Sequence, residues 1–194
     1  REIVDLTKES GTYLLVDETY RDMAFEDATP NAATLGTHVL SVSSLSKTYG
    51  LPGIRIGWII CKDKNLMEKF LAAKEQMVIC GSVLDEEVAY QFLSKRQEFL
   101  PKIKATIYEK RKILFDWFKE QEHIEFVEPK AGVVCFPRLK TTDPAKVDEF
   151  YNVLNKEHQT WVGPGHWFEM ERRYMRVGYG WPKKQELIDG LHCI

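Results

Sequence analysis

The sequence has no paired-cysteine motif among its 194 residues, and its cysteines and histidines do not cluster. The four cysteines form no C-x-x-C pair, and the five histidines stand at no ligand spacing from them. A disulfide scaffold and a structural zinc site are therefore both excluded, and free thiols indicate a reducing compartment. We predict a cytoplasmic protein without a structural metal.

The sequence also lacks a long apolar run and an excess of charge of one sign. No stretch approaches the roughly 20 apolar residues that a membrane helix needs, and the formal net charge is −2. Nucleic acid and anionic membranes select basic surfaces, so we predict neither as a partner. Hydrophobic residues make up 44% of the chain, which is enough for a packed core and excludes a disordered protein.

Helical and strand patterns alternate through the first half of the chain. Short apolar runs predict buried strands at 13–16, 39–42 and 54–60. Helical periodicity predicts helices at 1–10, 63–76 and 82–93, with Asp63 and Ser82 as N-caps. The apolar stripe of the second helix is expected to be buried: Leu66, Met67, Phe70, Leu71 and Ala73. This order predicts an α/β layer structure in which the carboxyl ends of the strands face one way.

A long helical pattern at 101–121 separates this part from the rest of the chain. Acids and bases alternate on its surface, which favours a solvated helix over a nucleic-acid-binding one. Beyond it, the sequence predicts strands at 124–127, 133–136, 160–162 and 174–179, and helices that begin at Asp143 and near Lys183. We predict three parts: a large α/β domain at 1–97, a bridging helix at 98–121 and a small α+β domain at 122–194.

The stretch 39–58, VLSVSSLSKTYGLPGIRIGW, holds the residues best suited to chemistry. Ser44 and Lys47 form an S-x-x-K pair just after a predicted strand. One reading makes Ser44 a nucleophile activated by Lys47, as in penicillin-binding serine enzymes. That chemistry also needs SDN and KTG elements, which the sequence lacks. The other reading makes Lys47 the nucleophile, through an imine with a carbonyl cofactor.

A carbonyl cofactor with a pyridine ring and a phosphate needs three further interactions with the protein, and the sequence contains residues suited to each of them. Asp17 can keep the ring nitrogen protonated, and Tyr20 can donate to the ring oxygen. Arg55 and Ser44 can bind the phosphate, while nearby glycines let the backbone approach it. Taken alone, D-x-x-Y at 17–20 is more often a loop acid with a packing tyrosine.

Together, VDETY at 16–20 and SSLSKTYGLPGIRIGW at 43–58 resemble class I/II pyridoxal-phosphate-dependent aminotransferases of the aspartate aminotransferase type. The resemblance extends over essentially the whole chain, including the long helix and the Val-Gly-Pro-Gly and Arg-Val-Gly segments. It implies an α/β fold: part of the large pyridoxal-phosphate-dependent transferase domain, with a mixed, mostly parallel sheet, followed by a small α+β C-terminal domain.

The resemblance also implies a role for each residue of the motif. Lys47 would hold pyridoxal 5′-phosphate as a Schiff base and shuttle a proton between the substrate α-carbon and the cofactor. Asp17 would pair with the pyridinium nitrogen and Tyr20 with the ring oxygen. Ser44 and Arg55 would hold the phosphate.

Arg176 matches the family arginine that grips the α-carboxylate of the substrate. In YMRVGYG, strand alternation places Met175, Val177 and Tyr179 on one face and Arg176 on the other. A lone arginine in a strand is more often a surface residue, and the resemblance reverses that reading. The paired glycines of the family are here Ala131 and Gly132, a change that narrows the substrate side of the pocket.

The resemblance leaves the N-terminal half of the family without a counterpart in this sequence. That half provides a phosphate-binding loop, a ring stacked on the cofactor and an asparagine near the ring oxygen. We therefore expect a C-terminal fragment of a longer aminotransferase, which by itself binds the cofactor poorly and is inactive. The parent protein is expected to be a homodimer.

Three functions are compatible with these residues. The first is transfer of an amino group between an L-amino acid and a 2-oxo acid. The second keeps the cofactor and changes the reaction to that of a β-lyase, a decarboxylase or a ring-forming synthase. The third is a non-catalytic effector domain of a transcription regulator that uses the same fold.

Overall fold

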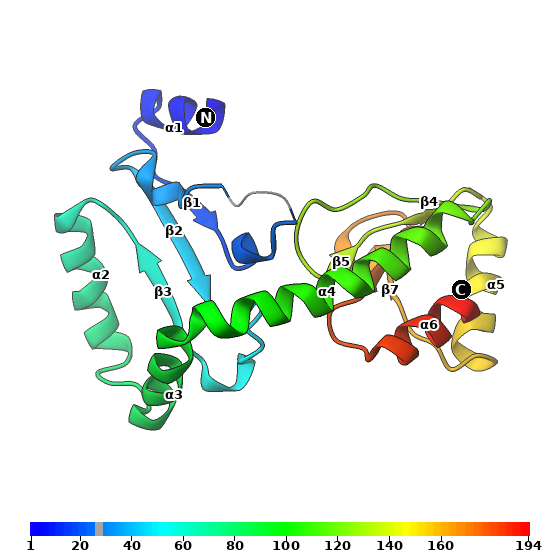
Figure 1. Cartoon of the computed structure of the whole chain (residues 1–194). Helices are drawn as coiled ribbons and strands as arrows, with labels where there is room; N and C mark the ends of the chain where they lie inside the picture. Colours follow the sequence, from blue (N-terminus) through cyan, green and yellow to red (C-terminus); the bar gives the residue numbers. More distant parts are fainter. Residues whose placement is uncertain (26–28) are drawn as a thin grey trace. The chain divides into compact units, whose positions relative to one another are not determined.

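The computed structural model describes residues 1–25 and 29–194 (Figure 1). The chain folds into two compact units, Arg1–Pro101 and Lys102–Ile194. The boundary falls inside helix α4, Arg96–Lys119. The predicted start of this helix at Pro101 was wrong. Proline is favoured at helix starts, but here the helix continues through it and loses one backbone donor. The three-part division at 97 and 121 stays a prediction.

A sheet in the order β1-β2-β3 organises the first unit. Its strands are Leu14–Asp17, Val39–Ser44 and Gly57–Ile60. β1 runs parallel to β2, with Asp17 paired to Val42, and β3 runs antiparallel to β2, with Gly57 opposite Ser44. β1 and β2 therefore end, and β3 begins, at the same edge of the sheet. The α/β order is as predicted, but the prediction that the carboxyl ends of the strands face one way was wrong for β3, which runs antiparallel to β2.

The middle strand is buried as predicted, whereas the two outer strands are not. Val39, Leu40 and Ser41 of β2 are all buried, but Leu15 in β1 is 62% exposed and Ile60 in β3 is 41% exposed. The prediction of three buried strands was therefore wrong for the outer two. An apolar run shows that a strand has apolar faces, but it does not show what covers them.

The third strand is shorter than the predicted 54–60. Pro52–Ile54 form the 3-10 helix η3, and Arg55 then adopts a left-handed conformation with φ +52°. Pro52 fixes its own φ and starts this turn, so the strand can begin only at Gly57.

The helices of the first unit begin close to the predicted positions. They are α1 Glu2–Glu9, α2 Lys64–Met77 and α3 Val83–Ser94, with the 3-10 helices η1 Arg21–Met23 and η2 Ala32–Thr34. Asp63 caps α2 by accepting from Leu66 N at 3.1 Å, and Ser82 caps α3 by accepting from Asp85 N at 3.3 Å.

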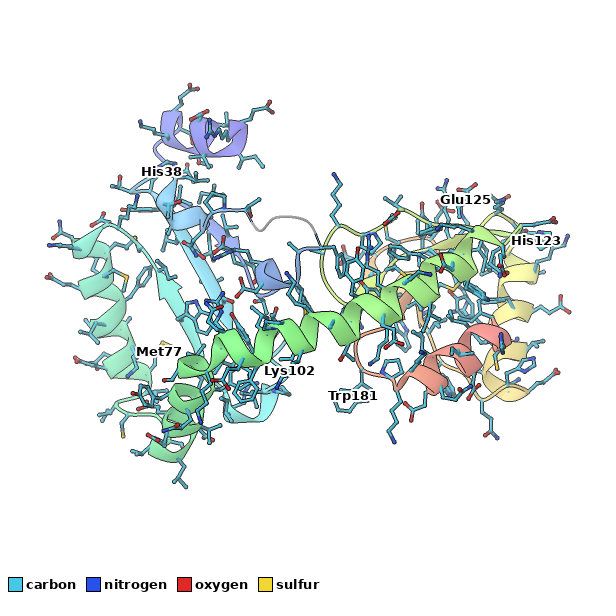
Figure 2. All side chains as sticks on the ribbon, viewed as in Figure 1. His38, Met77, Lys102, His123, Glu125 and Trp181 are labelled. Carbon is cyan, nitrogen blue, oxygen red and sulfur yellow. The ribbon has the colours of Figure 1, made fainter. Side chains whose placement is uncertain are left out.

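The predicted buried stripe of α2 was wrong. Among the residues that the structure describes, no side chain of α2 is buried, and Leu71 is 55% exposed. Among the described residues α1 has no buried side chain either, and His38 holds it instead: Nε2 of His38 lies 3.2 Å from Thr7 Oγ1 and 3.0 Å from Val4 O (Figure 2). Neither helix is therefore part of the buried core of this unit.

The core of the first unit lies beneath the loop that follows β2. Leu45, Tyr49 and Ala89 are buried at its centre. Partly buried side chains pack against this centre: Leu51, Ile54, Ile56, Trp58, Phe92 and Leu100. The loop and η3 thus contribute to the core together with α3.

Two small sheets form the second unit. One has the order β5-β8-β7, with strands Val134–Cys135, Met175–Gly178 and Gly163–Pro164, and the other pairs β4, Ile124–Glu125, with β6, Arg138–Leu139. The predicted strand at 160–162 was wrong. Thr160 N donates to Leu154 O at 3.0 Å, so this residue still belongs to the end of the preceding helix. The two-residue β6 was not predicted, because it is too short to show a period.

Helices α5, Pro144–Lys156, and α6, Lys184–Cys193, complete the second unit with the 3-10 helix η4, Gly165–Phe168. Asp143 caps α5 as predicted, by accepting from Ala145 N at 2.9 Å. The core side chains come from α4, α5, β8 and α6: Leu114, Phe118, Val147, Leu154, Met175, Val177, Tyr179, Leu187 and Leu191. Trp181, in contrast, is 96% exposed (Figure 2). Nowhere in the described part of the chain is a helix both long and apolar enough to cross a membrane.

Candidate active site

The predicted site residues of the first unit all lie at one edge of its sheet. Asp17 is the last residue of β1, Ser44 is the last residue of β2, and Lys47 follows in the next loop. Arg55 stands just before β3, whose first residue pairs with Ser44. Tyr20 is the N-cap residue of η1, shortly after β1. Parallel pairing of β1 and β2 is what brings these five residues to a common edge.

The Asp17 carboxylate is exposed and is oriented by its neighbour Thr19. Oδ1 of Asp17 accepts from Thr19 Oγ1 at 2.5 Å and from Thr19 N at 2.9 Å. These hydrogen bonds, the hydroxyl first and the amide second, hold the pKa of Asp17 below its ordinary value. The site therefore contains a fixed carboxylate that is charged at neutral pH.

Lys47 lies in a loop in which nearby side chains on both sides of it are buried. Leu45 N donates to Ile56 O at 3.1 Å, and Leu51 N donates to Leu45 O at 2.9 Å, which closes the loop. Leu45 and Tyr49 enter the core, whereas Lys47 is exposed. The loop is anchored from below, so the lysine is left to face the sheet edge or solvent.

Thr48 joins the lysine loop to the turn that follows β1. Its side chain is only 1% exposed, and its Oγ1 donates to Thr19 O at 2.5 Å. The residue after Lys47 is thus bonded to the residue that orients Asp17. The sequence gave no sign of this contact, because the two threonines are far apart along the chain.

Ser44 and Arg55 both keep polar atoms available. Ser44 Oγ accepts from Ser46 N at 3.3 Å, and among the described residues its hydroxyl donates to no partner. Arg55 is exposed, and within the described residues its guanidinium makes one hydrogen bond, from Nη1 to Pro52 O at 2.7 Å. A hydroxyl and a largely unused guanidinium form a donor set suited to a phosphate.

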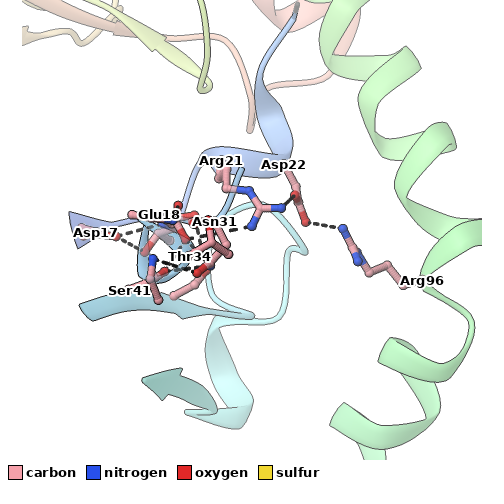
Figure 3. Close-up of polar contacts among 12 residues, drawn as sticks. Asp17, Glu18, Arg21, Asp22, Asn31, Thr34, Ser41 and Arg96 are labelled. Atoms are coloured by element: carbon pink, nitrogen blue, oxygen red, sulfur yellow. Dashed lines mark hydrogen bonds and ion pairs between the residues drawn. The ribbon is translucent and has the colours of Figure 1, made fainter. Parts of the chain in front are cut away.

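Glu18 is a structural neighbour of the candidate site that the sequence prediction missed (Figure 3). Its carboxylate accepts from Asn31 Nδ2 at 2.5 Å, from Ala32 N at 2.9 Å and from Ser41 Oγ. Asp17 and Glu18 are adjacent, so strand alternation sends them to opposite faces. That alternation is the signal that could have separated an outward acid from an inward, structural one.

A second polar network supports η1 from the core side. Tyr49 OH donates to Asp22 Oδ2 at 2.5 Å. Arg96 Nη2 donates to the same oxygen at 2.8 Å (Figure 3). Burial, reinforced by the hydrogen bond to Asp22, raises the pKa of Tyr49 to about 12. Tyr49 follows Thr48 in the lysine loop, so both residues bind this loop to the segment after β1.

A cavity of about 230 Å³ in the first unit is lined on this side by polar residues such as Glu18, Asn31 and Ser43. None of the predicted residues Asp17, Tyr20, Ser44, Lys47 and Arg55 lines it. The role of these five residues stays a prediction, and this cavity does not test it. Its lining combines polar side chains that hydrogen-bond one another, such as Glu18 and Asn31, with apolar ones such as Ile60.

Arg176 lies in the second unit and behaves as the strand pattern predicts. Met175, Val177 and Tyr179 are buried, and Arg176 is exposed on the other face of β8. The Cζ atom of Arg176 stands 6.0 Å from the centre of the Phe168 ring. Arg176 thus lies near an aromatic ring, and its role in substrate binding stays a prediction that rests on the resemblance.

Gly132 of the Ala131–Gly132 pair has φ +91° and is fixed from the core. Its carbonyl accepts from Tyr179 OH at 2.9 Å. A side chain at position 132 would be strained in this conformation. Position 131 has no positive φ, so its backbone tolerates a side chain. Alanine therefore stands at the one position of the pair where it causes no backbone strain.

Comparison with known proteins gives consistent results. The family model described as "Aminotransferase class I and II" matches residues 1–188. Capreomycidine synthase of Streptomyces vinaceus is 31% identical over 197 residues, which cover 100% of this chain and 49% of that protein. The HTH-type transcriptional regulator NorG of Staphylococcus aureus is 28% identical over 203 residues, with 100% and 44% covered.

A solved structure gives the same result at the level of the fold. A PLP-dependent aminotransferase from Streptococcus suis superimposes with a TM-score of 0.88 and 31% identity, over 99% of this chain and 50% of that one. The chain spans about half the length of the relatives it matches. Its sequence and its fold place this chain in the class I and II aminotransferase family.

Proposed function

We propose that the protein moves an amino group between an L-amino acid and a 2-oxo acid, with pyridoxal phosphate bound at the edge where β1 and β2 end. The observation that carries this proposal is the common position of Asp17, Ser44, Lys47 and Arg55 at that edge. When bound, the cofactor supplies a carbonyl carbon for covalent attachment of amines and a ring that withdraws electrons from the substrate α-carbon.

The residues present fit this cofactor. Pyridoxal phosphate needs an anion at its ring nitrogen, and the exposed Asp17 carboxylate has a lowered pKa. It needs donors for its phosphate, and Ser44 and Arg55 retain unused N–H and O–H groups among the described contacts. It needs an accessible amine, and Lys47 is exposed.

Each residue then has a defined task. Lys47 would hold the cofactor through its Nζ, and its free amine would accept the proton from the substrate α-carbon and return one to the product. Asp17 remains ionised and holds the proton on the ring nitrogen. Tyr20 donates to the ring oxygen, and Ser44 and Arg55 fix the orientation through the phosphate.

Arg176 binds the substrate carboxylate. Its planar guanidinium can donate two parallel hydrogen bonds to a carboxylate, which fixes the direction of the α-carbon. This role applies to amino acids and to 2-oxo acids alike, because both carry the same group. The side-chain preference has to come from other parts of the site.

Replacement of Lys47 by alanine in the intact protein tests the proposal. The wild-type protein should show an absorbance band of covalently bound cofactor that borohydride removes, and Lys47→Ala should lack both the band and turnover. Lys69→Ala, at an exposed lysine of α2 in the same unit, is the matched control. Wild-type turnover in Lys47→Ala would sink the assignment.

A second candidate reaction is ring formation on the same cofactor. It is favoured by the 31% identity to capreomycidine synthase, which covers this whole chain. Product analysis separates the two reactions. Amino transfer requires a 2-oxo acid acceptor for continued turnover, whereas a synthase proceeds without one. Cofactor binding with no turnover on any amino acid would instead favour a regulator of the NorG kind.

The intact protein is further proposed to be a cytoplasmic homodimer that acts on small molecules. The free thiols Cys61, Cys80, Cys135 and Cys193 are in keeping with a reducing compartment. Sedimentation of the intact protein at several concentrations tests the dimer. A monomer that retains full turnover would contradict it.

A further inference from the structure

Two threonines connect the lysine and the carboxylate of the proposed site. Thr19 gives both its hydroxyl and its amide to Asp17 Oδ1, at 2.5 Å and 2.9 Å. Within the described residues, Oδ2 of Asp17 accepts no hydrogen bond, so one carboxylate oxygen is occupied and the other is left open. The carboxylate therefore has a defined orientation before any ligand arrives.

Thr48 extends this connection to the lysine loop. It is the residue directly after Lys47, and its hydroxyl donates to Thr19 O at 2.5 Å. With 1% of its surface exposed, Thr48 has no access to water as an alternative partner. Consecutive Cα atoms are about 3.8 Å apart, so a bond that fixes Thr48 also limits where Lys47 can lie.

We propose that Thr19 and Thr48 are positioning residues, whose two hydroxyls hold the Lys47 loop and the Asp17 carboxylate in a fixed mutual placement. The inference rests on the proposed function, since the placement matters only if both groups engage one cofactor. The connection runs from the backbone of Lys47 through Thr48 and Thr19 to Asp17. Neither threonine takes part in bond making.

The plain alternative is that both hydroxyls are merely satisfied polar groups of the interior. Replacement by valine keeps the shape and removes the hydroxyl, whereas replacement by serine keeps the hydroxyl and removes a methyl group. If the hydroxyls only satisfy interior polar groups, valine lowers the stability but leaves the Asp17 pKa and the kcat of the folded protein unchanged. If they position the site, valine changes the Asp17 pKa or kcat, and serine restores the wild-type value.

The first experiment concerns Thr19 and needs no cofactor. The pKa of Asp17 is measured by carbon NMR titration in the cofactor-free intact protein. Thr19→Val should raise it toward the ordinary carboxyl range, and Thr19→Ser should leave it lowered. Thr34→Val is the matched control, since Thr34 Oγ1 donates to Asn31 O at 2.6 Å in the same unit and not to Asp17. An unchanged Asp17 pKa in Thr19→Val would overturn the proposal.

The second experiment concerns Thr48 and measures both cofactor attachment and turnover. Thr48→Val should slow borohydride trapping of pyridoxal phosphate on Lys47 and lower kcat about tenfold to a hundredfold, the range expected for a misplaced reacting group. Thr48→Ser should retain wild-type rates. Equal trapping and equal kcat in Thr48→Val and wild type would overturn the proposal. If Thr48→Val does not fold, the Thr19 titration decides alone.

The two proposals fail in different ways. Wild-type turnover in Lys47→Ala would refute the proposed function, whatever the effect of the threonine replacements. An unchanged Asp17 pKa in Thr19→Val, in a protein whose turnover still depends on Lys47, would refute only the positioning role.

Discussion

Replacement of Gly50 by alanine should weaken the loop that carries Lys47, although the new methyl group would touch nothing. Gly50 has φ +69°, and a Cβ built there meets no heavy atom within 4 Å. The cost therefore comes from the backbone alone, because a left-handed conformation costs an alanine about 1–2 kcal/mol. Gly50 N donates to Lys47 O at 3.1 Å, so this strain falls on the turn that contains the lysine.

Gly53 provides the matched control three positions further on. It lies inside η3, without a positive φ, and a Cβ there also meets nothing within 4 Å. Gly53→Ala should be neutral or stabilise the fold by up to about 1 kcal/mol, because alanine has less freedom in the unfolded chain. The two variants thus differ in backbone conformation and not in contacts.

Urea unfolding of the intact protein and its affinity for pyridoxal phosphate together provide the assay. Gly50→Ala should unfold at a lower urea midpoint and bind the cofactor more weakly, while Gly53→Ala should not lower the urea midpoint. The reasoning would be refuted if both variants shifted the midpoint equally, or if Gly53→Ala were the more harmful.

Three further predictions follow from burial and charge. Leu45→Ala should destabilise the protein by about 2–5 kcal/mol in urea titration, because Leu45 is 0% exposed beneath the lysine loop. Leu71→Ala, at a 55% exposed site, should change stability by less than about 0.5 kcal/mol, and equal losses would contradict the assigned core. Iodoacetamide at pH 8 should label exposed Cys80 and spare Cys135 in the native protein, as burial raises the pKa of Cys135 to about 12; equal labelling rates would refute this. Arg176→Lys should raise KM for amino acids at least about tenfold, since lysine lacks the bidentate fork; an unchanged KM would remove Arg176 from the substrate site.

Much of the order of elements, and the edge at which the candidate residues meet, were predictable from the sequence. Asp17 and Ser44 end the first two strands, Lys47 follows the second strand, and parallel pairing brings the carboxyl ends of these strands together. These are local signals, because each residue is marked by the strand immediately before it. The helix caps Asp63 and Asp143 belong to the same class of signal.

The contacts that hold the site together were not predictable. The bond from Thr48 to Thr19 joins residues in two different loops, and no local pattern encodes which hydroxyl meets which carbonyl. Arg55 adopts a left-handed conformation, which usually favours glycine. An arginine at this position therefore gave no sign of a left-handed turn. Periodicity identified the apolar face of α2, but burial depends on what packs against that face.

The burial of the central strand of the second unit has a consequence for local unfolding of the chain. Its central strand, Met175–Gly178, pairs on both sides with β5 and β7, and its inward side chains are buried. Such a core can act as a cooperative folding unit with its own opening free energy. In native-state hydrogen exchange, the amide protons of this strand should therefore be among the last to exchange. Those of α2, whose side chains are not buried, should exchange through local fraying long before the rest of the molecule opens.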